Sequence, residues 1–259
     1  RNHRQVFLGH RLSTGRKLFC ACAYTFAAPP NTQVCPVCLG LPGSLPVLDE
    51  DAVKLALRAG LALGCRPHSV SEFARKNYFY PDLPRNYQIT QYEHPLLSGG
   101  QLGLSGSTVR LRRIHLEEDA GRSRADDPGQ ATGATTMVDC NRAGTPLMEI
   151  VTEPDMTSGD QVRQWLRLLL QTLEYLEVCD GNLAEGSLRC DANVGMRQTG
   201  QEPAGRPLTE IKNLNSLRSV GQAVDHEINR LTAEISAGVR VRAQTRSWDV
   251  AAGHSRFLR

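Results

Sequence analysis

The sequence contains no long hydrophobic run and no strong excess of charge of either sign. No apolar stretch approaches the ~20 residues that span a bilayer, so no membrane-spanning helix is expected. The basic start, RNHRQVFLGHRLSTGRK, has no apolar core of signal-peptide length, and we therefore expect a cytoplasmic protein. The net charge of +3 permits a polyanionic partner without requiring one, because nucleic-acid-binding domains usually carry a stronger, clustered excess.

The common short catalytic motifs are also absent. The chain has no G-x-x-x-x-G-K-[ST] phosphate-binding loop, no G-x-S-x-G nucleophile turn and no H-E-x-x-H metal motif. Neither Cys–His nor Ser–His catalysis has a local signature. With 259 residues, of which 40% are hydrophobic and 22% charged, the composition is typical of a soluble globular protein with a substantial core.

Cysteine, in contrast, is concentrated in one segment. The cysteine segment, residues 18–40 (LFCACAYTFAAPPNTQVCPVCLG), holds four of the eight cysteines, as one C-x-C pair and one C-x-x-C pair: Cys20, Cys22, Cys35 and Cys38. A secreted disulfide framework would spread its cysteines more densely over a shorter chain. Two close pairs in a reducing compartment predict a four-thiolate zinc site, which is structural because no coordination position stays open. The alternative is four ordinary reduced cysteines in a turn.

Periodic patterns predict three helices and several strands. Apolar residues recur at helical spacing in residues 52–64, 158–178 and 216–238, and the first and last of these runs end at glycine. Strand patterns occupy the start of 107–123, most of 146–156 and residues 188–196. Strands separated by long helices, without regular βαβ alternation, favour an α+β fold with a largely antiparallel sheet and packed helices.

Three carboxylates are candidates for a metal site. Glu149 and Glu153 lie four residues apart and therefore on the same face of one strand, and Glu118 follows another strand. Hard oxygen ligands of this kind suit Mg²⁺. From spacing alone, however, a solvated strand face is the more economical interpretation.

A polar strand face and a helix start are candidates for phosphate handling. Arg189, Asp191 and Asn193 alternate with apolar residues, and Lys212 lies shortly before a helix that starts near Ser216. A helix N-terminus beside a cation is a natural anion site. Ordinary capping of that helix by Ser216 or its neighbour would need no ligand.

Residues 71–96, SEFARKNYFYPDLPRNYQITQYEHPL, combine aromatic residues, cations and three prolines, which indicates a rigid extended loop. Its tyrosines could stack on bases or ribose while Lys76 meets phosphate. A proline-rich loop packed over the core explains the same composition. His115 is the one histidine within a candidate strand, and alternation points it away from Glu118, so we interpret it as structural.

Taken in order, these segments resemble the B subunit of the bacterial-type aspartyl/glutamyl-tRNA amidotransferase. The resemblance runs from about residue 17 to 249 and rests on these stretches: KLFCAC, PNTQVCPVCLGLPGSLPVLDEDAVKLALRAGLAL, FARKNYFYPDLPRNYQITQYE, IHLEEDAGRS, DCNRAGTPLMEIVTEPDM, EGSLRCDANV, TEIKNLNSLRSV and TRSWD. It implies a cradle-like catalytic domain related to glutamine synthetase. It also implies ATP- and Mg²⁺-dependent activation of the amino acid on Glu-tRNA(Gln) or Asp-tRNA(Asn), followed by amidation with ammonia released from glutamine by an A subunit. A small C subunit joins A and B.

The resemblance also implies roles for particular residues. Glu118 and Glu149 match family positions that bind Mg²⁺, and Lys76 matches a lysine needed for transamidation. The four cysteines match zinc ligands of many family members. Arg189, Asp191 and Asn193 match a polar pocket strand of the family, and together with Lys212 before the following helix they are the expected ATP or substrate pocket.

The sequence departs from the family pattern at both ends. Aligned on KLFC, Phe7 and Gly9 occupy the positions of a family Glu and His that bind Mg²⁺. Beyond TRSWD the family continues into helical and tail domains that hold tRNA, whereas this chain ends at AAGHSRFLR. The resemblance therefore implies a single catalytic cradle domain over residues 1–259, truncated or altered at each end. A non-catalytic zinc-bearing RNA-binding or assembly fragment is the alternative.

Overall fold

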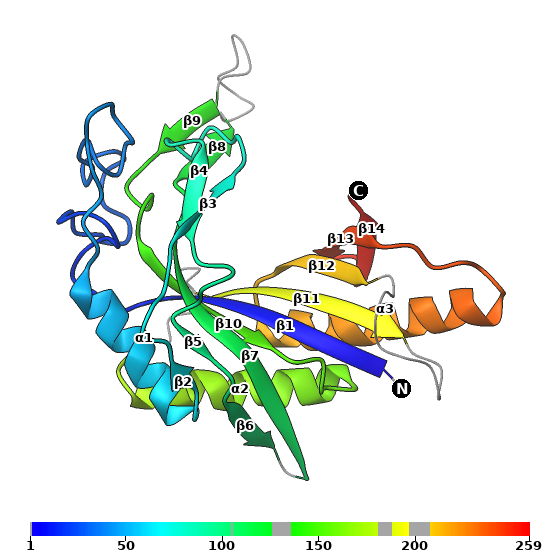
Figure 1. The fold of residues 1–259 in the computed structure, drawn as a ribbon. Helices are drawn as coiled ribbons and strands as arrows, with labels where there is room; N and C mark the ends of the chain where they lie inside the picture. Colours follow the sequence, from blue (N-terminus) through cyan, green and yellow to red (C-terminus); the bar gives the residue numbers. More distant parts are fainter. Residues whose placement is uncertain (1, 105, 126–135, 181–187, 197–207) are drawn as a thin grey trace.

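The computed structural model describes the chain except for residues 1, 105, 126–135, 181–187 and 197–207. The described residues form an α+β fold with one ten-stranded sheet, two small two-stranded sheets and three helices (Figure 1). The large sheet has the order β14-β13-β12-β11-β1-β10-β7-β5-β2, and β6 pairs with β7. Its described strand pairs are antiparallel except β12–β13, which α3 connects in parallel. The predicted α+β class and largely antiparallel sheet are confirmed.

The elements have the following bounds: β1 (Asn2–Arg11), α1 (Glu50–Ala62), β2 (Arg66–Pro67), β3 (Ala74–Asn77), β4 (Tyr87–Thr90), β5 (Leu97–Ser98), β6 (Gln101–Leu104), β7 (Ser107–Glu118), β8 (Arg122–Ala125), β9 (Thr136–Asp139), β10 (Pro146–Thr152), α2 (Gly159–Tyr175), β11 (Leu188–Met196), β12 (Thr209–Leu214), α3 (Leu217–Ser236), β13 (Gln244–Asp249) and β14 (His254–Phe257).

All three helices begin where a side chain satisfies a free backbone N–H at the first turn. Asp49 caps α1, Ser158 caps α2, and Ser216 caps α3 by accepting from Ser219 N at 3.1 Å. Gly64 and Gly238 follow α1 and α3 with φ of 70° and 73°, the left-handed conformation that glycine adopts at low cost. These helices are those predicted from periodicity. No helix in the described ranges is both long and apolar enough to cross a membrane.

Helices α2 and α3 cover one face of the large sheet, beneath β1, β10 and β11 in the view of Figure 1. Most sheet side chains turned toward them are apolar: Val6 and Leu8 on β1, and Ala192 and Val194 on β11, are fully buried. Arg4 on the same face of β1 is also fully buried, near Asp225 and Glu227 of α3. Trp165 of α2 is fully buried in the same core. The alternation predicted for β11 is therefore confirmed.

The opposite face of the sheet, called the polar face below, carries a group of polar side chains around Glu149, and strand register determines which residues meet on it. His115 of β7 lies opposite Glu149 of β10, Glu149 lies opposite Gly9 of β1, and Gly9 lies opposite Arg189 of β11. Because directly opposed residues of antiparallel strands share a face, these four positions form one row across the sheet. A parallel row places Phe7 between Val151 and Asp191.

Two local expectations differ from the structure. The segment 71–96 contains a β-hairpin, β3–β4, rather than an extended loop throughout, and Lys76 pairs with Gln88 in it. Strand β7 continues through Glu117 to Glu118 instead of breaking into a loop there. Both differences arise from strand pairing. Strand β3 is extended because it pairs with β4, and the end of β7 is extended because Glu118 pairs with Pro146 at the start of β10.

Candidate active site and metal centre

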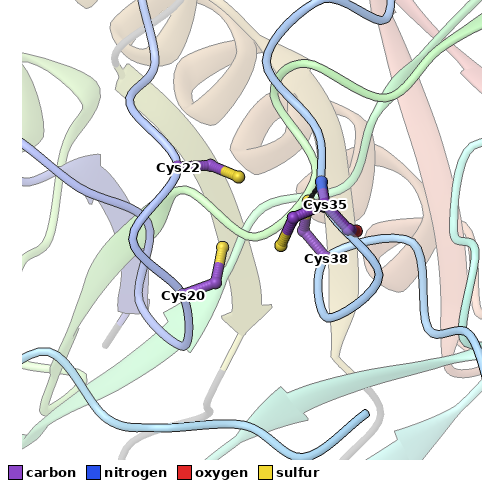
Figure 2. A group of neighbouring side chains, drawn as sticks. All are labelled: Cys20, Cys22, Cys35 and Cys38. Carbon is purple, nitrogen blue, oxygen red and sulfur yellow. Dashed lines mark hydrogen bonds between the residues drawn. The ribbon is translucent and has the colours of Figure 1, made fainter.

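The four cysteines of the cysteine segment meet in space. Their sulfur atoms all lie within 4.8 Å of one another and point inward from two separate turns (Figure 2). Four sulfurs bound at ~2.3 Å to one zinc ion would lie ~3.8 Å apart. Cys35 Sγ and Cys38 Sγ are separated by 3.9 Å. The set therefore fits a tetrahedral four-thiolate zinc site, as the spacing predicts.

The surroundings of the cysteine cluster favour a thiolate at Cys38, whereas a hydrogen bond with Cys38 raises the pKa of Cys20 and burial raises that of Cys22 to about 11. The backbone N–H of Cys35 donates to Cys38 Sγ at 3.1 Å. A hydrogen bond from Cys20, together with the nearby charge of Lys17, lowers the pKa of Cys38 to about 4. Lys17 is itself fully buried, and its Nζ donates to the carbonyl oxygen of Gln33 at 2.9 Å. A buried lysine beside the cluster offsets part of the negative charge that four thiolates bring.

A second cluster of potential ligands occupies the polar face of the sheet. One ligand atom each from His115, Glu117 and Glu149 lies within 4.8 Å of the others. Burial, reinforced by the charge of Glu117, raises the pKa of Glu149 to about 7. Burial also raises the pKa of Glu117, which accepts a hydrogen bond of 3.3 Å from Thr90 Oγ1. A raised pKa favours the neutral form of each carboxyl group, unless a cation binds between the two groups and stabilises their charges.

His115 does not supply that cation. Burial, together with the charges of Arg113 and Lys76, lowers the pKa of the imidazole to about 3, so the ring is neutral. Arg113 Nε donates to His115 Nδ1 at 3.4 Å, which leaves the Nε2 proton facing Glu149 Oε1, 3.9 Å away. The two carboxylates are therefore the stronger ligand candidates, and their oxygens fit a hard divalent ion such as Mg²⁺. His115, interpreted from the sequence as structural, thus lies within the cluster of candidate ligands.

Glu118 does not join Glu149, contrary to the expectation that the two would converge on one metal. Consecutive strand residues point to opposite faces, and Glu117 shares the face of His115 and Glu149. Glu118 Oε1 instead accepts from Arg85 Nη1 at 3.0 Å and from the backbone N–H of Ile89 at 3.2 Å. Burial raises its pKa to about 7 even so. The sequence analysis did not single out Glu117 as a ligand. Because His115 and Glu117 are two residues apart on one strand and so share a face, the position of His115 could have indicated Glu117.

Glu153, the other acid considered for this face, also lies apart from the cluster. It follows β10 after a register shift at Val151–Thr152 and forms an ion pair with Arg112 at 2.9 Å. The expectation that Glu149 and Glu153 share one strand face is therefore wrong, because the strand register shifts between them.

Lys76 faces the carboxylate cluster from the neighbouring hairpin. Its charge acts on Glu117, Glu149 and His115, and in each case it shifts the pKa downward. Its Nζ lies 5.9 Å from the centre of the Tyr78 ring. Since β3 is exposed, the lysine lies beside the carboxylates at the margin of the polar face rather than inside the core.

The polar residues of β11 and β12 form ion pairs around the same face. Arg189 contacts Asp119 at 2.7 Å, and Lys212 contacts Asp191 at 2.8 Å and Glu210 at 2.9 Å. Asn193 is half-buried and lies opposite Glu210. The start of α3 is capped by Ser216, so ordinary capping explains this helix terminus without an anion.

Comparisons with known proteins agree over nearly the whole chain. The family model described as the GatB/GatE catalytic domain matches residues 8–259, which extends the matched region past residue 249 to include β14. Among curated relatives, the B subunit of the aspartyl/glutamyl-tRNA(Asn/Gln) amidotransferase of Geobacter sulfurreducens is 51% identical over 254 residues, covering 96% of this chain and 52% of that protein.

Two further proteins with the same name give similar values. The one from Thermodesulfovibrio yellowstonii is 50% identical over 253 residues, covering 96% of this chain and 52% of its own length. The one from an Anaeromyxobacter species is 49% identical over 263 residues, covering 98% and 53%. The chain thus spans about half the length of the curated relatives that it matches.

Proposed function

The chain belongs to the family of the GatB/GatE catalytic domain, and on this premise we propose that it is the catalytic core of a tRNA-dependent amidotransferase subunit. In this proposal residues 1–259 form one cradle-like domain related to glutamine synthetase. The domain uses ATP to activate the side-chain carboxylate of Glu-tRNA(Gln), Asp-tRNA(Asn) or both for amidation. The observation that carries the proposal is the pair of neighbouring carboxylates on the polar face of the sheet, the buried Glu117 and the partly buried Glu149.

The proposed reaction has two steps whose atoms balance. A carboxylate does not react with ammonia directly, so its oxygen first attacks the γ-phosphorus of ATP and ADP leaves. Ammonia derived from glutamine then attacks the activated carbonyl carbon, phosphate leaves and a proton is lost, which gives the amide. An Mg²⁺ ion at this face would supply charge neutralisation at the transferring phosphoryl group.

The residues of the chain take the following proposed roles. Glu117 and Glu149 hold the metal, and Lys76 reaches the same region with its charge during transamidation. Residues on β11 and β12 form the ATP and substrate pocket and are kept in place by the ion pairs described above: Arg189, Asp191, Asn193 and Lys212. Excluding water from this face would protect the activated carboxylate from hydrolysis. The cysteine cluster holds zinc in a structural role.

Reconstitution tests this function. We expect the protein carrying Phe7→Glu and Gly9→His, combined with an amidase A subunit and a small C subunit, to hydrolyse ATP and amidate at least one of the two charged tRNAs when glutamine and Mg²⁺ are present; the unmodified chain should show little or no amidation. The measurement is conversion of tRNA-bound Glu or Asp to Gln or Asn, with each tRNA assayed separately. Omission of ATP is the control for direct transfer. Amidation that proceeds without ATP would contradict the activation step.

The non-catalytic alternative is favoured by two residues. Phe7 and Gly9 occupy positions where the family resemblance implies metal ligands, and β1 places both on the polar face, with Gly9 directly opposite Glu149. Neither residue offers a ligand atom in its side chain. On this alternative the chain keeps a zinc-bearing scaffold that binds RNA or assists assembly, and the complete complex shows no ATP hydrolysis even with the two ligands restored.

Restoring the two ligands should raise activity if the catalytic proposal is right. We expect the double variant Phe7→Glu, Gly9→His to hydrolyse ATP with Mg²⁺ about a hundredfold faster than the unmodified chain, because misplacement of a catalytic group by about an ångström costs on that order. The space exists: a Cβ at Gly9 would lie 3.8 Å from its closest neighbour, Arg189 Cβ. Gly103→His, at an open position on β6, is the control. Fast hydrolysis by the unmodified chain, unchanged in the double variant, would show that these positions are not ligands.

A further inference from the structure

One arginine lies where three separate segments meet. Arg85, in the connection between β3 and β4, forms a buried ion pair with Glu118 at the end of β7; their side chains are 9% and 4% exposed. On its other side Arg85 contacts the end of the cysteine segment: a Cβ added at Gly40 would lie 2.5 Å from Arg85 Cγ. The Gly40 backbone therefore packs directly against the arginine stem, just beyond Cys38.

Glu118 extends this connection to the hairpin that carries Lys76. Its Oε1 accepts from the backbone N–H of Ile89 at 3.2 Å, and its backbone carbonyl accepts from Gln88 Nε2 at 2.8 Å. Gln88 is the residue directly opposite Lys76 in the hairpin. Strand β4, which pairs with the strand of Lys76, is thus bonded to Glu118 at Gln88 and Ile89 and to Glu117 at Thr90.

We propose that Arg85 is a positioning residue that ties the cysteine cluster to Lys76. The order of contacts is the Cys35–Cys38 turn, Gly40, Arg85, Glu118, and then the hairpin through Gln88 and Ile89. Under this proposal the thiolate cluster does more than stabilise its own loop, because its metal-bound geometry holds the arginine against Glu118. The consequence for the reaction rests on the function proposed above, whereas the structural linkage does not.

A buried ion pair is a suitable device for this purpose because its parts are costly to separate. Removing one partner leaves an uncompensated buried charge and strongly destabilises a protein, whereas replacing both by well-packed residues of similar volume is often nearly neutral. The pair thus tends to keep Arg85 in one place. The same asymmetry makes it possible to separate a loss of general stability from a loss of hairpin position.

Amide hydrogen exchange of the zinc-loaded protein tests the linkage. The variant Arg85→Met keeps the apolar stem that packs on Gly40 and removes the guanidinium. We expect amides of 74–77 and 87–90 to exchange about tenfold faster or more, while zinc content stays at the wild-type value. Arg112→Met is the matched control. Arg112 lies on β7 and also forms an ion pair, but its partner is Glu153 and its side chain is 49% exposed. This control variant should leave hairpin exchange unchanged.

Three further measurements distinguish positioning from general destabilisation. Arg85→Met combined with Glu118→Gln should recover most of the melting temperature, because no buried charge is left unpaired, yet keep the hairpin in fast exchange. Arg85→Lys should give partial rescue. Removing zinc with a chelator should accelerate hairpin exchange in the wild type and add little in Arg85→Met.

The proposal is overturned if hairpin exchange in Arg85→Met equals that of the Arg112→Met control, if exchange accelerates equally throughout the chain, or if the double variant restores slow hairpin exchange. In the reconstituted complex carrying Phe7→Glu and Gly9→His, Arg85→Met should lower kcat about tenfold with little change in KM for ATP, since Lys76 and not the nucleotide pocket is displaced. An altered hairpin exchange without any change in kcat would retain the linkage and count against the role proposed for Lys76.

Discussion

Replacing Glu149 by glutamine should abolish carboxylate activation, with an expected loss of about a hundredfold to a thousandfold in the rate of ATP-dependent amidation. The reason is that Glu149 is one of two neighbouring carboxylates that fit a divalent ion, and removal of one group that stabilises transition-state charge typically costs that much. Affinity for tRNA should change little, because it comes mainly from cations that contact phosphates. The rate is measured in the complex carrying Phe7→Glu and Gly9→His, and tRNA binding in the same preparation.

Stability and metal binding provide the controls for this variant. Burial raises the pKa of Glu149 to about 7 from its ordinary value of 4.5, so the folded protein holds a proton that the unfolded chain has released. Without metal, this residue's contribution to stability therefore falls as the pH rises from about 4.5 through about 7. Glu149→Gln removes that loss, and the metal-free variant should be at least as stable as the wild type at neutral pH.

The matched control is Glu153→Gln, which alters a partly exposed acid that follows the same strand and pairs with Arg112. It should leave amidation and Mg²⁺ binding unchanged. If Glu149→Gln amidates at the normal rate, or if both variants lose Mg²⁺ binding equally, the assignment of Glu149 as a ligand is wrong.

Loss of the zinc site should have the second large effect, and it should appear in stability rather than in a particular reaction step. Cys35→Ser is expected to lower zinc from about one ion per chain to almost none, because a tetrahedral site needs all four ligands. Binding free energy of a structural zinc ion contributes to folding, so the melting temperature should fall by about 10 °C or more. Metal analysis and thermal unfolding measure the two effects.

The control for the zinc prediction uses a cysteine outside the cluster. Cys65 is buried, its Sγ donates to the carbonyl oxygen of Gly99 at 3.0 Å, and it lies on the other side of α1 in sequence. Cys65→Ala should lower stability through a small cavity but leave the zinc content unchanged. A wild-type protein that contains no metal and melts identically after treatment with a chelator would refute the zinc site.

Local patterns in the chain were sufficient for the features whose partners lie close in sequence. The helix starts at Asp49, Ser158 and Ser216 follow from side-chain capping within three residues. The alternation of β11 between buried and polar positions follows from the two-residue repeat of a strand. The four cysteines were identified as one group because a turn already holds each pair together, and only two short segments had to meet.

Features that depend on pairing between distant strands could not be obtained in this way. Alternation places Glu117 and Glu118 on opposite faces of β7, but it does not say which face Glu149 shares. That choice depends on the register of β7 against β10, which opposes His115 to Glu149 and could have been reversed by a slip of one residue. The hairpin around Lys76 and the contacts of Arg85 with Gly40 and Glu118 also join segments that are distant in sequence. They depend on how the whole sheet packs, and no periodic pattern in the sequence indicates them.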